Sequence, residues 1–212
     1  RDVERSRGLG DVYKRQSWDR ARFEVCAHKW ADLSEPGYGV ALMNDCKYGY
    51  DVHEGVMGLT LIKSGIFPNP DADQGQHEFT YALFPHQGDF RKGSVVREAY
   101  DLNCPMAWEK VQGIYEDSFS MLQIAEENVM ADTVKAAEDG NGIIVRIYET
   151  WGMRTKVHVN FPLAPDAQVT VCDCMENFSG VENADMTRAQ DGWSFTMKPY
   201  EIKTLRIVNE KK

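Results

Sequence analysis

The sequence contains no apolar run of the roughly 18 to 20 residues that a membrane-spanning helix needs. Basic residues are also scarce, because 24 Lys and Arg stand against 33 Asp and Glu, for a formal charge of −9. Nucleic acids and anionic membrane surfaces repel an acidic protein. We therefore expect neither nucleic acid nor a membrane among its partners.

The sequence also lacks the regular cysteine spacing of a disulfide framework. An odd number of cysteines is scattered along it, and only one residue separates Cys172 from Cys174, whereas a redox or zinc motif has two residues between its cysteines. The five positions are Cys26, Cys46, Cys104, Cys172 and Cys174. This pattern predicts reduced thiols and a cytosol-like, cytoplasmic compartment.

Closely spaced histidine pairs are missing as well. No two of the histidines at 53, 77, 86 and 158 have the short spacing of a local ligand pair. The sequence therefore predicts no metal site within this chain.

The first sixteen residues, RDVERSRGLGDVYKRQ, differ from the rest of the chain. They carry five basic and three acidic residues, and their apolar positions fit neither the helical nor the strand period. We interpret residues 1–16 as a non-native segment derived from sequencing-adaptor read-through, with a native basic arm as the alternative. The chain would then begin in mid-protein near Ser17, so that an export signal of the parent would not be visible.

What the sequence has in abundance is alternation of apolar and polar residues, the period of a half-buried strand. With 42% hydrophobic residues, the chain can bury one large core or two smaller ones. The alternating runs, ten in all, are Phe23–Ala27, Val40–Leu42, Met57–Leu61, Phe79–Leu83, Phe119–Met121, Val145–Ile147, Val157–Phe161, Val169–Val171, Trp193–Met197 and Leu205–Ile207.

A helix is predicted over 94–103, where Ser94 can cap and Val95, Ala99 and Leu102 share one face. Between the other runs stand turn signals rich in Pro, Gly, Asn and Asp. We place a domain boundary near Ala125, in the acidic stretch 125–142. The sequence thus predicts an all-β chain in which residues 126–212 form a small C-terminal β-sandwich.

Six segments in this order resemble the C-terminal region of the α-mannosidases of glycoside hydrolase family 38. The match extends from about residue 22 to the end and is most similar to the branch of cytosolic and vacuolar enzymes and their bacterial relatives. The segments are GVALMNDCKYGYDV, GLTLIKS, PNPDADQGQHEFTYALFPHQGDF, REAYDLN, VKAAEDGNGIIVRIYETWG and PYEIKTLRI.

The resemblance implies that residues 17–125 are part of a large β-sandwich that precedes the small one. It also implies that the parent is a retaining α-mannosidase acting on α-mannoside oligosaccharides in glycan catabolism. In the family, the catalytic residues and the ligands of a divalent, zinc-type metal lie in an N-terminal α/β barrel and the helical domain after it, before Ser17. We therefore expect no catalytic residue and no metal ligand in this chain, which would be inactive without that N-terminal catalytic domain as partner.

The stretch 42–55, LMNDCKYGYDVHEG, is the first candidate for contact with substrate. Asn44, Lys47 and Tyr48 can donate hydrogen bonds to sugar hydroxyls, and family loops of the large sandwich reach the rim of the cleft. The alternative is an Asx-type turn at Asn44, a packed Tyr48 and a solvated Lys47.

The second candidate is PDADQGQHE, 70–78. Asp71 and Asp73 are carboxylates two residues apart and accept hydrogen bonds from vicinal hydroxyls. Other branches of the family place a substrate-contacting arginine near here, whereas this chain has Gln74 and Gly75. The alternative is that Asp71 caps a turn and His77 is a hydrogen-bonded histidine at a strand start.

Three functions of different class fit these observations. The first is the non-catalytic C-terminal part of a retaining α-mannosidase, which the motif order favours. The second is an autonomous carbohydrate-binding sandwich. The third is a domain that mediates homo-oligomerisation.

Overall fold

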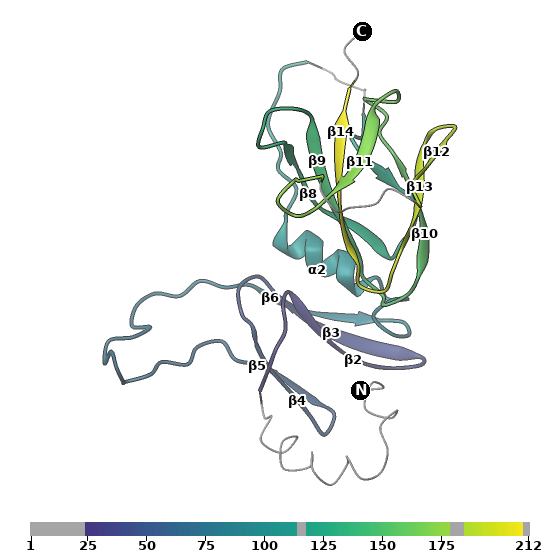
Figure 1. Ribbon diagram of the computed structural model, residues 1–212. Helices are drawn as coiled ribbons and strands as arrows, with labels where there is room; N and C mark the ends of the chain where they lie inside the picture. The colour runs from purple at the N-terminus through teal and green to yellow at the C-terminus, as the bar shows by residue number, and fades with distance from the viewer. Residues whose placement is uncertain (1–23, 114–117, 179–184, 210–212) are drawn as a thin grey trace. The chain divides into compact units, whose positions relative to one another are not determined.

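The computed structural model describes residues 24–113, 118–178 and 185–209. Antiparallel strands dominate these residues and form four sheets, which confirms the all-β prediction of two sandwich-like bodies. The chain divides into two compact units, residues 1–109 and 110–212 (Figure 1). The segment 1–16, with its proposed non-native origin, lies outside the described residues. No helix in the described part of the chain is long and apolar enough to cross a membrane.

The first unit holds two three-stranded sheets. One has the order β1-β4-β5 and the other the order β2-β3-β6. Their strands are β1 (Val25–Cys26), β4 (Gly49–His53), β5 (Val56–Leu59), β2 (Trp30–Glu35), β3 (Tyr38–Asn44) and β6 (Tyr81–His86). A long segment without strands joins β5 to β6 and extends away from both sheets (Figure 1).

The helix α2 (Val95–Asn103) covers one face of the β2-β3-β6 sheet. Val95 and Ala99 are buried against Ala41 and Met43 of β3, as their spacing predicts. The predicted cap is wrong, because Ser94 has a left-handed backbone, φ 55°, and its side chain makes no capping hydrogen bond. The helix is therefore held by its buried face, as is usual for short helices.

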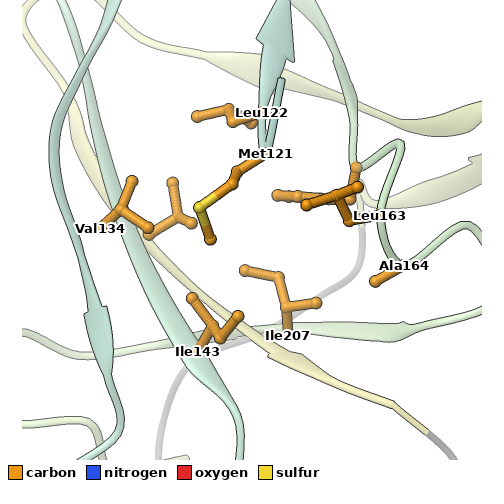
Figure 2. Close-up of a pocket in the computed structure, with 9 residues that line it drawn as sticks. Met121, Leu122, Val134, Ile143, Leu163, Ala164 and Ile207 are labelled. Atoms are coloured by element: carbon orange, nitrogen blue, oxygen red, sulfur yellow. The ribbon is translucent and has the colours of Figure 1, made fainter. Parts of the chain in front are cut away.

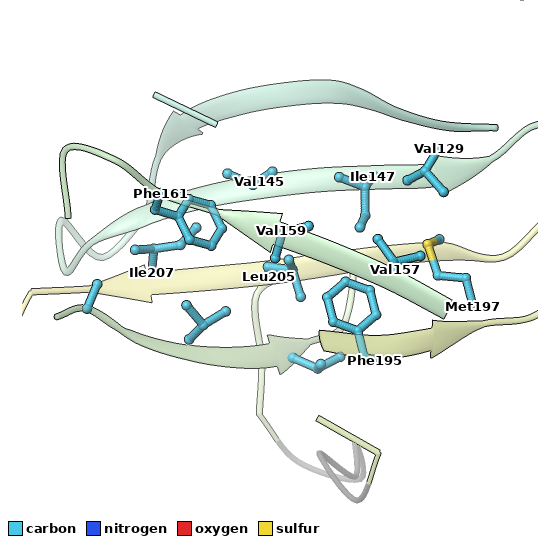
Figure 3. Close-up of a cluster of buried hydrophobic side chains, with 13 residues drawn as sticks. Val129, Val145, Ile147, Val157, Val159, Phe161, Phe195, Met197, Leu205 and Ile207 are labelled. Carbon is cyan, nitrogen blue, oxygen red and sulfur yellow. The ribbon is translucent and has the colours of Figure 1, made fainter. Parts of the chain in front are cut away.

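The second unit is a sandwich of two four-stranded sheets, with the orders β12-β13-β10-β7 and β11-β14-β9-β8. Inward side chains of both sheets form one core, in which Val157, Ile147, Leu205 and Met197 are fully buried (Figure 3). The strands are β7 (Gln123–Ile124), β8 (Val129–Ala136), β9 (Ile143–Glu149), β10 (Thr155–Asn160), β11 (Gln168–Cys172), β12 (Thr187–Ala189), β13 (Gly192–Met197) and β14 (Ile202–Val208).

The structure differs from the predicted strands at several places. β2, β4, β7, β8 and β12 were not predicted, and β4 lies within the stretch 42–55. The run Phe119–Met121 is not a strand. In β8 a register shift between Ala131 and Thr133 breaks the alternation that reveals a strand. The two compact units meet between residues 109 and 110, and β7 pairs with β10 within the second unit.

Candidate functional site

Asn44, at the end of β3, organises the turn between β3 and β4. Its side chain is buried, its Nδ2 donates to the hydroxyl of Tyr50, and its Oδ1 accepts from the backbone N–H of Lys47 at 2.5 Å. The backbone carbonyl of Asn44 accepts from Nδ2 of Asn103 on α2 at 3.0 Å. Because its amide is engaged and buried, Asn44 shapes the turn that carries Lys47 and Tyr48.

The same turn is tied to the residues just before β6. Thr80 N–H donates to Oδ2 of Asp45 at 3.0 Å, and Asp45 N–H donates to the Thr80 carbonyl at 3.2 Å. Hydrogen bonds from the Cys46 thiol and from Thr80 hold the pKa of the Asp45 carboxyl below its usual value. The ammonium of Lys47 lies 4.8 Å from the centre of the Phe79 ring.

Tyr48 is half exposed, at 53% of its surface. Its ring lies 4.9 Å from the imidazole of His28, centre to centre, at a tilt of 46°. This contact supports one face of the ring. Tyr48 and Lys47 thus combine a supported position with polar groups that reach solvent.

Asp71, Asp73 and His77 belong to the long segment between β5 and β6. Asp71 N–H donates to the side chain of Asn69 at 3.1 Å, so Asn69 forms the turn that Asp71 was expected to cap. Asp73 has a left-handed backbone, φ 59°, and its carbonyl lies 2.7 Å from Nε2 of His77. All three side chains are exposed. Hydrogen bonds join Asp45 to Thr80, and the ammonium of Lys47 lies over the Phe79 ring. The described contacts of Asp71 and Asp73, in contrast, stay within their own segment.

The first unit also contains a buried His–Asp pair that sequence reasoning missed. Nε2 of His86 lies 2.8 Å from Oδ1 of Asp32, and both side chains are at most 5% exposed. Gly39 and Gly93 allow this arrangement, because a Cβ on either would lie within 2.5 Å of the imidazole. Asp32 points inward from β2, which hides the apolar alternation of that strand.

In the second unit, the carboxylate of Glu149 is a buried anchor for two loops. It accepts backbone hydrogen bonds from Trp151, Gly152 and Tyr200 at 2.8 to 3.0 Å, and one from the side chain of Asn128 at 2.8 Å. Burial alone would raise the pKa of Glu149, but these hydrogen bonds outweigh it and hold the pKa below its usual value. This position is structural, and its signal in the sequence is an acid at the end of a mostly apolar strand.

His158 lies between Ser194 and Asp191 in an order that hydrolases also use. Nδ1 of His158 is 3.1 Å from the Ser194 hydroxyl, and Nε2 is 3.2 Å from Oδ1 of Asp191. His158 and Ser194 are opposite neighbours in the β10–β13 ladder, and the Asp191 side chain is 73% exposed. His158 and Ser194 are half-buried and Asp191 is exposed, so the three groups lack the preorganised, water-excluding surroundings of a catalytic triad. We interpret them as a cross-strand polar pair with a surface ion pair.

The second unit has an apolar groove, lined by residues of β8, β9 and β14 and of the segments 121–122 and 161–164 (Figure 2). Its cavity volume is only about 40 Å³, and its lining is almost entirely apolar. Sugar hydroxyls need hydrogen-bond partners, so this groove does not fit a glycan. The lining residues are Met121, Leu122, Val134, Ile143, Val145, Phe161, Leu163, Ala164 and Ile207.

The described residues bring together no group of three or more His, Cys, Asp or Glu side chains able to hold a metal ion. The described residues therefore offer no site for a divalent ion, whose ligands the family resemblance assigns to the N-terminal domains. All five cysteines are unpaired.

Comparison with known proteins gives two family matches in order. Residues 11–71 match the glycosyl hydrolases family 38 C-terminal domain, and residues 128–205 match the family 38 C-terminal beta sandwich domain. The first match begins inside the segment 1–16, whose origin stays a prediction.

Relatives in two organisms cover nearly the whole chain. It is 38% identical over 205 residues to alpha-mannosidase G of Dictyostelium discoideum and 37% identical over 196 residues to alpha-mannosidase 2C1 of Homo sapiens. Each alignment covers 91% of this chain but only 18% or 19% of the relative. The chain therefore spans about a fifth of the length of the curated relatives it matches.

A solved structure shows the same fold. The crystal structure of an alpha-mannosidase from Enterococcus faecalis superposes with a TM-score of 0.66 at 21% identity, over 86% of this chain and 21% of that one. The fold, the order of the two domain matches and the identity to the relatives agree. This chain belongs to the C-terminal domains of glycosyl hydrolase family 38.

Proposed function

We propose that this chain forms the β-sandwich region of a retaining α-mannosidase that hydrolyses terminal α-mannosides in oligosaccharides. The observation that carries the proposal is the ordered match to both C-terminal domains of the family, together with 37% to 38% identity to relatives named alpha-mannosidase. The catalytic residues and the zinc-type ion would be supplied by other parts of the polypeptide. A retaining mechanism needs two carboxyl groups about 5 Å apart in a cleft that excludes water.

Within this proposal, the turn 44–48 and the segment 70–78 form part of the cleft rim. Lys47 and Tyr48 offer donors to sugar hydroxyls, and Asp71 and Asp73 offer acceptors. Asn44 acts indirectly by holding the turn, since its amide is already bonded. The link between Asp45 and Thr80 supports a shared location of the two stretches, with Tyr48 or Lys47 expected within roughly 15 Å of Asp73 or His77, a few side-chain lengths.

The first experiment tests the isolated chain. Purified residues 17–212 should not hydrolyse an aryl α-mannoside above the buffer rate, with or without added zinc or cobalt. Metal-dependent turnover by the isolated chain would contradict the proposal.

A chimera tests whether this chain can serve as the C-terminal region of an active enzyme. Replacing the matched C-terminal fifth of Dictyostelium alpha-mannosidase G by this chain should retain mannoside hydrolysis, whereas deleting that region should abolish it. In the chimera, Asp73→Ala should lower kcat/KM by about ten- to a hundredfold, the 1 to 3 kcal/mol of one lost polar contact, with little change in Tm. Asp101→Ala, at an exposed position of α2, is the matched control and should leave kcat/KM unchanged. Early melting of Asp73→Ala with normal kinetics would return this segment to a role in connecting strands.

Two alternatives give different results. An autonomous carbohydrate-binding domain would bind mannosides in calorimetry without any other part of an enzyme. A domain for homo-oligomerisation would be a multimer in light scattering.

We propose a cytoplasmic location for the protein, which is supported by its five unpaired cysteines.

A further inference from the structure

The connection between β8 and β9 carries Asn141–Gly142, which is the sole Asn–Gly dipeptide of the sequence. It lies in the turn 137–142 of the second unit, and the Asn141 side chain is exposed. Asparagine is a thermolabile residue, and exposed turn tips are sites where covalent changes to the chain, such as proteolytic cleavage, concentrate. This turn therefore has a chemical vulnerability separate from the cleft proposed above.

The geometry of Gly142 adds to this vulnerability. Its carbonyl accepts a hydrogen bond from Ala137 N–H at 3.0 Å, but its own N–H donates to no acceptor among the described residues. Its φ is +100°, and a Cβ would lie 2.4 Å from the carbonyl oxygen of Ile207. A side chain at 142 would clash with that backbone atom, so the fold requires glycine at this position. Because glycine has no side chain, nothing at 142 hinders attack of its backbone nitrogen on the Asn141 side-chain amide.

We propose that Asn141 is a site of spontaneous deamidation. The backbone nitrogen of Gly142 loses its proton to water or hydroxide and bonds to Cγ of Asn141, and Nδ2 leaves as ammonia. The resulting five-membered succinimide then takes up one water molecule. The ring opens at either carbonyl to give aspartate or isoaspartate. The reaction consumes water, releases ammonia and needs no oxidant, reductant or enzyme.

The product changes an ion pair of the second unit. Asn141 N–H donates to Oδ1 of Asp139 at 2.9 Å, while Oδ2 of Asp139 lies 2.6 Å from Nη1 of the buried Arg206. Deamidation places a second carboxylate beside Asp139, and isoaspartate also lengthens the backbone between 141 and 142. Both changes disturb the turn that presents Asp139 to Arg206, so the modified protein should melt at a lower temperature than the unmodified one.

Mass spectrometry of the aged full chain tests this directly. Trypsin releases residues 136–146, AAEDGNGIIVR, in which Asn141 is the sole asparagine. After incubation at mildly alkaline pH, this peptide should gain the mass of an amide-to-acid exchange, and isoaspartyl methyltransferase should label it. Asn177, also exposed but followed by Phe178, is the internal reference, because its bulky neighbour hinders attack.

Two further samples complete the test. Asn141→Gln should fold normally and show neither the mass gain nor the label at this peptide. The free synthetic peptide 136–146 gives the rate without the fold, and the folded chain should deamidate at a comparable rate. An unchanged peptide in the folded chain while the free peptide reacts, or equal conversion at Asn177, would overturn the proposal.

Discussion

The two units differ in how completely their sheets are covered. In the second unit, two four-stranded sheets face each other across one core of thirteen buried residues. The first unit has two three-stranded sheets, and its main cluster contains four buried residues beneath one helix. Large apolar side chains remain exposed there, among them Leu83 at 69%, Ile66 at 83% and Phe67 at 89%. A sandwich closes its own core, whereas sheets with one covered face depend on further contacts.

Separating the units should give the largest effect. Residues 110–212 alone should unfold cooperatively on heating, because both sheets of their sandwich are present. Residues 1–109 alone should show weak or no cooperativity and bind a hydrophobic dye such as ANS, because their buried cluster is small. Calorimetry and dye fluorescence on the two pieces check this. A sharp, dye-free transition of residues 1–109 would remove the contrast.

Two leucines allow a matched core test. Leu205→Ala in β14 removes a fully buried side chain and should lower the free energy of unfolding by about 2 to 5 kcal/mol. Leu83→Ala in β6, the same change at an exposed position, should alter it by less than about 0.5 kcal/mol. Denaturant unfolding of the full chain measures both. Equal losses would mean that the outer face of β6 is covered in solution.

The buried carboxylate of Glu149 in the second unit should affect how the free energy of unfolding depends on pH. Since the folded state lowers the pKa of Glu149, its contribution to stability is complete above the ordinary value of 4.5 and is lost as pH falls through the folded value. Glu149→Gln should cost about 1 to 3 kcal/mol at neutral pH and flatten the loss of stability on acidification. The control is Glu109→Gln, at an exposed position. An acid limb as steep in Glu149→Gln as in wild type would contradict this assignment.

The smallest effect is expected at the turn of the first unit. Lys47→Met keeps most of the side-chain volume but removes the ammonium over Phe79, worth about 0.5 to 1 kcal/mol at an exposed site. Thermal melting of the full chain should therefore change little. A loss similar to that of Leu205→Ala would show that this turn is part of the structural core.

Much of the second unit was predictable, because each of its main strands carries apolar side chains on the one face that packs into the core. Val157–Val159 and Trp193–Phe195–Met197 alternate as the register of β10 and β13 requires. The first unit is harder to derive. Tyr50 and Val52 alternate in β4, but turn-forming and charged residues surround them and favoured a loop. The polar contacts of the turn 44–48 could not be predicted from the sequence. An asparagine at position 44 is compatible both with contact to substrate and with a buried structural role.

The sequence by itself determined the strand-rich architecture, the helix at 95–103 and the family, because side-chain periodicity and motif order are local properties of the chain. Tertiary structure alone decided the rest. Asp32 is inside because His86, 54 positions away, meets it, and Glu149 is buried because the backbone at 200 reaches it. Such pairings stabilise polar groups that local pattern would place in solvent, because a buried charge depends on partners distant in the sequence.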